Sequence, residues 1–201
     1  MMILRHSPAS PFVRKVKIAA DILGLSERIE LSDADTIAPE PAFLDQNALG
    51  KIPTLVLEDG TTLFDSPVIL EYLDHLAGGG RILPSEPKAR FAALRMQALC
   101  DGILDAALLI VYEGRFRKPE MKVQAWIDRQ LGKIDRALAV LEASPPAIGE
   151  VPDVGPITLA CALGYLDLRL EGRWRPDHPK LVAWLDQFAA RVPAFAKTKP
   201  A

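Results

Sequence analysis

Cysteine and histidine are scarce in this sequence of 201 residues. The two cysteines, Cys100 and Cys161, allow at most one disulfide, which excludes a disulfide-stapled secreted fold and favours a reducing cytoplasm. Because both lie in helical-looking sequence, we expect them to be small buried apolar groups rather than nucleophiles. The three histidines, His6, His75 and His178, lack the spacing of a zinc site, so we expect no metal.

Long apolar runs and an excess of charge of one sign are missing as well. No window approaches 18 uninterrupted apolar residues, so no membrane span is predicted, and the apolar run at the N-terminus is too short for a signal peptide. The formal net charge of −2 gives no electrostatic reason to expect nucleic-acid binding. There is no Gly-rich phosphate loop, Ser-His-Asp pattern, basic stripe or repeat. Apolar residues make up 49% of the chain, which is ordinary for a soluble protein with a core.

The first 77 residues mix predicted strands and helices. Strands are predicted for "MILRH" (2–6) and "RIEL" (28–31), with a helix between them that begins after Ser10-Pro11 and stops at Gly24. A strand–helix–strand order favours a parallel pair. Two further strands flank Asp59-Gly60, a strong signal for a two-residue hairpin, and a helix follows from Ser66 to the glycine run at 78–80. The predicted order is β-α-β followed by β-β-α.

From Pro84 onward the pattern is helical throughout. Apolar residues recur at steps of three and four, and "ITLACALGYLDL" is apolar nearly all round, as in a helix at the centre of a bundle. The Gly/Pro-rich stretch at 78–87 is typical of a linker. We therefore predict a small α/β domain (1–77), a linker (78–87) and an all-helical domain (88–201).

Ser10 has two interpretations. It is a good N-cap, since its hydroxyl can accept a hydrogen bond from a free backbone N–H, and Pro11 suits the first helical position. The same geometry would also serve a ligand, because a helix N-terminus favours negative charge and a hydroxyl can donate to that charge. The residues near Ser10 do not decide between the two.

Two other Pro-containing pairs are equally ambiguous. Pro53 follows Ile52 at a strand start, where proline is tolerated; a cis bond there would turn the backbone of Ile52 outward, able to pair with an extended peptide. Asp65 and Ser66 precede Pro67 at a helix start. Ser66 is a plain N-cap in one interpretation. In the other, Ser66 and a free N–H seat a carboxylate while Asp65 binds an ammonium, as an α-amino-acid end would require.

Taken together and in order, these segments resemble the cytosolic glutathione S-transferase superfamily. The segments that carry the resemblance are "SPFVRKVKIAADILGL", "NALGKIPTLV", "LFDSPVILEYLDHL" and "GPITLACALGYLDLR". They span nearly the whole chain, and the second and third are the most specific. The resemblance implies a thioredoxin-like N-terminal domain and an all-helical C-terminal domain, the architecture that the periodicity predicts independently.

The resemblance also assigns roles to single residues. It implies that Pro53 is a cis proline and that the backbone of Ile52 pairs with the cysteinyl part of glutathione. It also implies that Asp65 and Ser66 bind the γ-glutamyl end. Phe12 is then a further glutathione contact, and Lys51 reaches the glycyl carboxylate. Ser10 takes the place of the Ser or Cys that holds the thiol in related proteins, with Ser7 as the alternative. Glutathione is thus the expected co-substrate, and the expected assembly is a cytoplasmic homodimer that serves detoxification.

Three departures from the family pattern stand out. Ala48 replaces a proline in the loop before Ile52, and no Cys-x-x-Cys is present, because Ser10 and Val13 occupy those places. The absence of a Cys-x-x-Cys motif excludes dithiol redox chemistry at the start of this helix. Thr158 matches the first position of a capping box, but Cys161 stands where the family has Asp. Thr158 is still expected to cap its helix.

The second substrate is less well specified. The resemblance places it against the helix that runs from about Pro87 to Arg117. Tyr112 and Phe116 are i, i+4 neighbours that could simply pack, and Arg115 could simply be solvated. Alternatively, these three residues form an electrophile site with a cationic anchor that suits an acidic co-substrate. Tyr165 and Trp174 are expected in the core.

Three functions fit this pattern. The first is a glutathione transferase that presents the thiolate of glutathione to a small electrophile, by addition or displacement. The second keeps glutathione but uses it for isomerisation, reductive dehalogenation, or peroxide and disulfide reduction. The third is a non-catalytic binding module on the same fold, against which the intact Asp65-Ser66 and Ile52-Pro53 pairs argue.

Overall fold

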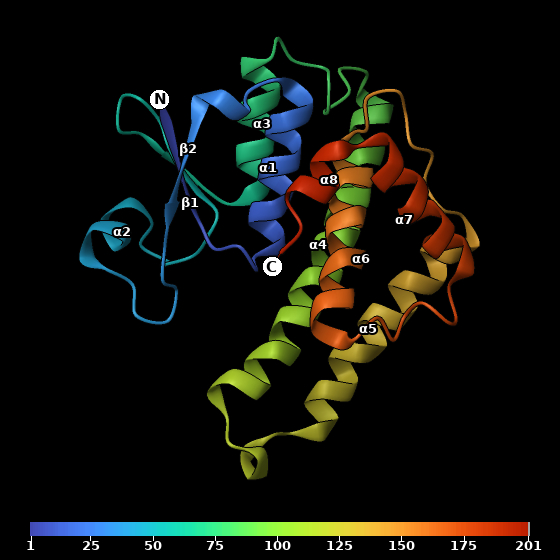
Figure 1. Ribbon diagram of the computed structural model, residues 1–201. Helices are drawn as coiled ribbons and strands as arrows, with labels where there is room; N and C mark the ends of the chain where they lie inside the picture. Colours follow the sequence, from blue (N-terminus) through green and yellow to red (C-terminus); the bar gives the residue numbers. More distant parts are fainter. Residues whose placement is uncertain (201) are drawn as a thin grey trace. The chain divides into compact units, whose positions relative to one another are not determined.

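The computed structural model describes residues 1–200, which fold into two compact units. The first unit comprises Met1–Arg90 together with the chain from Val192 onward, and the second comprises Phe91–Arg191. In the first unit a small sheet is covered by helices, whereas the regular elements of the second unit are all helices within the residues described (Figure 1). The C-terminal return to the first unit was not foreseen from the sequence.

The sheet of the first unit has four strands in the order β2-β1-β3-β4. These strands are β1 (Met2–His6), β2 (Ile29–Asp33), β3 (Thr54–Val56) and β4 (Thr62–Leu63). The pairing of β1 with β2 is parallel, as predicted, and the other two pairings are antiparallel. The hairpin differs from the prediction: its loop spans residues 57–61 and is closed by a 2.8 Å bond from the Leu57 N–H to the Thr61 carbonyl.

Helices α1 (Pro11–Leu23) and α3 (Ser66–Leu76) pack side by side against the sheet (Figure 1). Their apolar faces are fully buried, and Gly24 ends α1 in the left-handed conformation at φ 72° that glycine adopts without strain. The short helix α2 (Pro41–Gln46) and the 3-10 turn η1 (Ser26–Arg28) lie between β1 and β3 in the chain and had not been predicted.

The final helix, α8 (Pro193–Lys197), packs on α1. Arg14 of α1 is almost completely buried, and its guanidinium donates to the Phe195 carbonyl at 2.6 Å. The same guanidinium lies 4.0 Å from the centroid of the Phe195 ring. This contact fixes the end of the chain to the first unit.

The second unit is built from four long helices joined by loops and the 3-10 turn η2 (Pro119–Met121). They are α4 (Pro87–Phe116), α5 (Gln124–Ala143), α6 (Val154–Leu170) and α7 (Pro179–Arg191). Helix α6 is buried on nearly all sides, as its composition predicted. It approaches α4 closely at Gly155, where an added Cβ would lie 2.7 Å from the side chain of Met96. Glycine is therefore needed at this crossing.

Thr158 does not cap α6, contrary to the prediction. The helix begins four residues earlier, with Asp153 as its N-cap, and the Asp153 carboxylate accepts from the Gly155 N–H at 2.8 Å. Thr158 is fully buried inside the helix, and its hydroxyl donates to the Val154 carbonyl at 2.6 Å. Asp153, earlier in the chain, already accepts from one of the free N–H groups, and the helix starts there.

Both cysteines are fully buried, as expected of small core residues. No helix within residues 1–200 is long and apolar enough to cross a membrane.

The predicted linker is held in place by Asp74 of α3. Its carboxylate accepts backbone hydrogen bonds from Gly80 at 2.8 Å, Arg81 at 2.9 Å and Ile82 at 2.7 Å. Asp74 is 4% exposed, and Ile82 is fully buried beside it. The chain that follows the glycine run is therefore anchored to the end of α3 by hydrogen bonds to Asp74.

We predict that Asp74→Ala lowers the free energy of unfolding by at least about 2 kcal/mol, because three N–H groups lose a charged acceptor. Asp74→Asn keeps one carbonyl acceptor, so its free energy of unfolding should lie between that of Asp74→Ala and that of the wild type. Urea unfolding followed by circular dichroism measures both. A loss below about 0.5 kcal/mol for Asp74→Ala would show that the linker holds its position without this carboxylate.

Candidate functional site

Strand register brings three separate segments to one end of the sheet. Arg5, near the end of β1, pairs with Thr54 at the start of antiparallel β3. Leu63, at the end of β4, pairs with Leu55. The loop after β1, the residues before β3 and the residues after β4 must therefore emerge at the same end of the sheet. We call this end the site edge.

Ser10 lies at the site edge as the N-cap of α1. Its Oγ accepts from the Val13 N–H at 3.3 Å, and its own N–H donates to the Ser7 carbonyl at 3.1 Å. The capping role predicted for Ser10 is thus confirmed. A hydroxyl offers one donor and two acceptor positions, so the O–H of Ser10 stays available after capping. Ser7 stands three residues before the N-cap and makes no hydrogen bond to the N–H groups of α1 among the residues that the structure describes.

Phe12 follows Ser10 in the first turn of α1 and is half-buried. The Nζ of the fully buried Lys15 lies 5.9 Å from the centroid of the Phe12 ring. The Phe12 ring thus lies beside a buried cation at the start of the helix.

The Ile52–Pro53 peptide bond is cis in the structure, as the resemblance implied. Pro53 is buried, Ile52 is half-buried and Lys51 is exposed. Ile52 precedes β3 and stands outside the strand pairings, so its backbone belongs to the site edge rather than to the sheet ladder.

Asn47 positions this segment and was not singled out from the sequence. Its side chain is 1% exposed and donates at 2.9 Å both to the Lys51 carbonyl and to the Thr54 hydroxyl. Its carbonyl oxygen accepts from the Leu49 N–H at 3.0 Å. The residue thus closes the loop in which Ala48 replaces the family's proline. In the sequence Asn47 is a lone asparagine at a turn, and asparagine is common in turns, so the sequence gave no sign that this one positions a site.

Asp65 and Ser66 begin α3 at the site edge. Asp65, not Ser66, is the N-cap residue, so the capping position proposed for Ser66 is wrong by one residue. The Asp65 carboxylate makes no capping hydrogen bond and is exposed, whereas Ser66 is 1% exposed. The Phe64–Asp65 peptide bond is also cis. An exposed carboxylate therefore stands beside a helix N-terminus whose first N–H groups it does not occupy.

In the second unit, Tyr112 and Phe116 of α4 form an edge-to-face pair with ring centroids 5.2 Å apart. The Arg115 guanidinium carbon lies 5.7 Å from the centroid of the Tyr112 ring. Arg117 forms an ion pair with the buried Glu113 at 3.1 Å, so this arginine stabilises its own helix. Tyr112 and Phe116 thus pack against each other, as their i, i+4 spacing indicated, and Arg115 lies beside the Tyr112 ring.

Tyr165 and Trp174 are both buried, as expected, with exposures of 4% and 6%. The Trp174 indole donates to the Asp167 carboxylate at 2.9 Å. Tyr165, in contrast, lies near a charged side chain that was not predicted: the Arg169 guanidinium carbon stands 5.9 Å from its ring centroid. Within residues 1–200 no group of three or more His, Cys, Asp or Glu side chains is placed to hold a metal ion.

Two protein-family models match this chain. The model for the glutathione S-transferase N-terminal domain matches residues 9–76, and the model for the C-terminal domain matches residues 124–187. The chain is 34% identical to the GST-like protein YibF of Escherichia coli, over 99% of this chain and 98% of that protein. The chain therefore belongs to the cytosolic glutathione S-transferase superfamily.

Solved structures agree with this assignment. A glutathione transferase family member from Pseudomonas fluorescens, with bound glutathione, is 44% identical and superposes with a TM-score of 0.92 over the full length of both chains. A second structure from that organism contains S-(propanoic acid)-glutathione, with 43% identity, a TM-score of 0.87 and full coverage of both chains. The predicted fold is thus confirmed: a thioredoxin-like N-terminal domain followed by an all-helical domain.

Asn47→Ala should lower the free energy of unfolding by about 2–4 kcal/mol, because three hydrogen bonds are lost. The Lys51 carbonyl keeps one donor, the Thr54 hydroxyl at 2.9 Å, but the Thr54 hydroxyl loses the donor that it accepts from. Asn47→Asp is the matched variant, since it keeps the acceptor for the Leu49 N–H but removes both donors, and we expect it to recover only part of the loss. Chemical denaturation gives the free energies, and amide hydrogen exchange at Leu49 reports the loop itself. Wild-type exchange at Leu49 in Asn47→Ala would show that this side chain does not hold the loop.

Proposed function

We propose that the protein is a glutathione transferase. It binds glutathione at the site edge and uses the thiolate to add to, or displace a leaving group from, a small electrophile. The observation that carries the proposal is the convergence of Ser10, Ile52–Pro53 and Asp65–Ser66 at one end of one sheet. The similar Pseudomonas chains bound to glutathione and to one of its thioethers support it, because a thioether is what such a reaction forms.

Each part of glutathione has a chemical counterpart at the site edge. The γ-glutamyl end carries a carboxylate and an ammonium, which suit the N-terminus of α3 with Ser66 and the exposed Asp65 carboxylate. The cysteinyl backbone pairs with the N–H and C=O of Ile52 in the manner of an added strand. The exposed Lys51 reaches the glycyl carboxylate, and Phe12 supplies an apolar wall.

Ser10 stabilises the thiolate in this proposal. A free thiol with a pKa of about 8.5 is only about 3% ionised at neutral pH, and lowering its pKa by two units needs about 2.7 kcal/mol. A hydrogen bond to a charged acceptor contributes about 1.5–3 kcal/mol, and a helix N-terminus about 0.3–1 kcal/mol. The Ser10 hydroxyl and α1 together therefore suffice without a cation. The proton leaves to solvent when the thiolate forms.

Tyr112, Arg115 and Phe116 line the electrophile site in this proposal, and the active protein is a cytoplasmic homodimer. These assignments follow the resemblance of the chain to its family. The alternatives keep the same site: a glutathione-dependent isomerase or reductase would use the thiolate differently, and a binding module would not use it at all.

Calorimetry with glutathione separates an enzyme from a binding module. The proposal expects heat of binding at millimolar glutathione or below, whereas no measurable heat would favour the module. Initial rates with an aryl halide, a peroxide and a mixed disulfide then distinguish transfer from reduction. The transferase requires the aryl halide to be the best substrate of the three.

Ser10→Ala should raise the pKa of the bound thiol by about one to two units, because the hydrogen bond to the anion is lost. It should also slow turnover of a generic electrophile at neutral pH by about tenfold or more. The ultraviolet absorbance of the thiolate as a function of pH measures the first effect, and initial rates measure the second.

Two controls isolate this role from capping. Ser10→Thr keeps both the cap and the donor and should retain a low thiol pKa, whereas Ser7→Ala should leave the pKa unchanged. The expected loss of the cap in Ser10→Ala is about 1 kcal/mol of stability and is measured separately by thermal unfolding. A low thiol pKa in Ser10→Ala, with a raised one in Ser7→Ala, would transfer the role to Ser7.

A further inference from the structure

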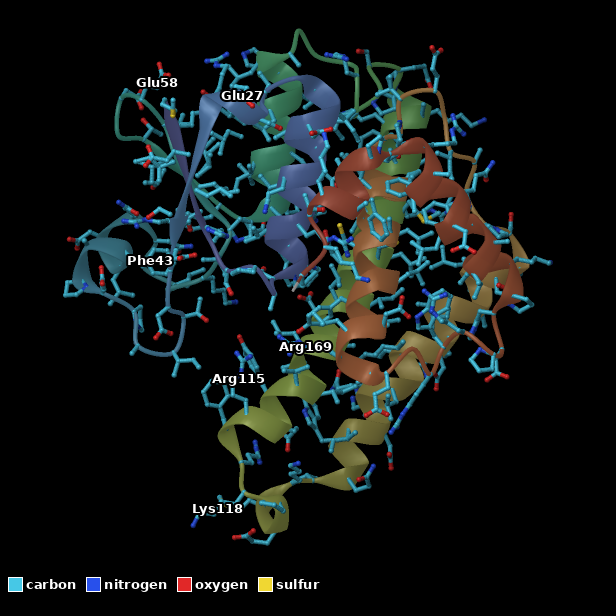
Figure 2. The ribbon with its side chains drawn as sticks, viewed as in Figure 1. Glu27, Phe43, Glu58, Arg115, Lys118 and Arg169 are labelled. Carbon is cyan, nitrogen blue, oxygen red and sulfur yellow. The ribbon has the colours of Figure 1, made fainter. Side chains whose placement is uncertain are left out.

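The connection between α4 and α5 is exposed along its whole length. Residues 114–126, which comprise the last residues of α4, the turn η2 and the start of α5, are all exposed. Figure 1 shows this connection projecting beyond α6 and α7 of the same unit, and Figure 2 shows Lys118 at its outer end. We call residues 114–126 the helical tip.

Large apolar side chains are exposed on the helical tip. Phe116 and Met121 are each 58% exposed, Val123 is 48% exposed and Trp126 is 39% exposed. The other two tryptophans of the chain are only 6% exposed. Single apolar residues scattered over a protein surface are normal, but four in one short exposed segment are a candidate interaction site.

The helical tip is positively charged, in contrast to the chain as a whole. It contains one anion, Glu120, and four cations: Arg115, Arg117, Lys118 and Lys122. The formal net charge of the chain is −2, so the net charge of +3 on the tip leaves −5 on the remaining residues. Arg117 pairs with the buried Glu113 at 3.1 Å, which still leaves three cations against one anion at the tip. The net charge of the whole chain therefore conceals a local cationic surface.

The backbone of the turn η2 is bonded within the helical tip. The Met121 N–H donates to the Lys118 carbonyl at 2.9 Å, and the Lys122 N–H donates to the Pro119 carbonyl at 3.3 Å. Pro119 itself has no N–H group to satisfy. Because a polar group that is already hydrogen-bonded costs less free energy to remove from water, this turn can approach an apolar phase at reduced cost.

We propose that the helical tip docks on an anionic lipid surface. Lysine and arginine are attracted to negatively charged head groups, and tryptophan is favoured at the boundary between head groups and acyl chains. Neither Lys118 nor Lys122 forms an ion pair with another described residue, so both are available to lipid phosphates. A lipid surface suits the tip better than an acidic protein does, because residues 114–126 are fewer than the roughly 20–30 residues that each side of a stable protein interface uses.

Co-sedimentation of the full-length protein with vesicles tests the role of charge. We expect binding to phosphatidylcholine vesicles that contain phosphatidylglycerol, at least about tenfold weaker binding to pure phosphatidylcholine, and a loss of affinity as salt is added. The double variant Lys118→Glu, Lys122→Glu should lower the partition coefficient by at least about 25-fold, because each cation near an anionic surface contributes about fivefold. Arg115 and Phe116 stay unchanged in every variant, since both belong to the proposed electrophile site.

A second double variant, Met121→Ser with Val123→Ser, tests the apolar contribution without changing the charge. It should weaken vesicle binding by about tenfold or more, because two exposed side chains lose the apolar surface that the lipid would bury. Val140→Ser is the matched control, since Val140 is 64% exposed near the other end of α5. The charge control is Lys180→Glu with Lys199→Glu, at two exposed lysines outside the tip. Both controls should bind within about threefold of the wild type, and thermal unfolding shows whether each variant folds.

The fluorescence of Trp126 reports whether the helical tip itself enters the lipid interface. Trp174 and Trp184 are buried, so a change in emission on addition of vesicles comes from Trp126. We expect the emission to shift to shorter wavelength with vesicles that contain phosphatidylglycerol, and to be quenched by lipids with brominated acyl chains. Trp126→Phe keeps an aromatic ring, so it should still sediment with the vesicles but lose the shift.

Three results would overturn the inference. Failure of the wild type to sediment with anionic vesicles at low salt would exclude a lipid partner for this surface. Equal loss of binding in the tip variants and in their controls would assign the binding to the protein as a whole. Sedimentation without any shift in the emission of Trp126 would mean that the tip stays in water. The glutathione site takes no part in these measurements, so the inference is independent of the transferase function proposed above.

Discussion

The pairing of β1 with its two neighbours is the constraint on which the site depends. β1 is an inner strand, parallel to β2 and antiparallel to β3, and this register decides where every connecting segment leaves the sheet. A slip of one residue would turn Leu4 and Leu55, both fully buried, toward the wrong face of the sheet. The apolar core therefore fixes the register, and the register places three polar segments at one end.

Two of these segments lead into the N-termini of helices, and these N-termini determine the electrostatic potential at the site edge. The N-termini of α1 and α3 each present backbone N–H groups and partial positive charge. At α1 a serine satisfies one N–H and still retains a hydroxyl proton, whereas at α3 the Asp65 carboxylate leaves the N–H groups open. One helix therefore suits an anion that is to be activated, and the other suits an anion that is to be held.

The long periodic elements were predictable from the sequence, and the local chemistry was less so. Helices such as α4 and α5 follow from their apolar spacing, but α2 and α8 are too short to show a period. The start of α6 was misjudged because Thr158 resembles a cap and Asp153 competes with it. The role of Asn47 was hidden because its partners include Thr54, seven residues away across a turn. Three short motifs were recognisable from the sequence: Ser10-Pro11, Ile52-Pro53 and Asp65-Ser66. Their order along the chain is typical of the family, whereas each motif alone is common.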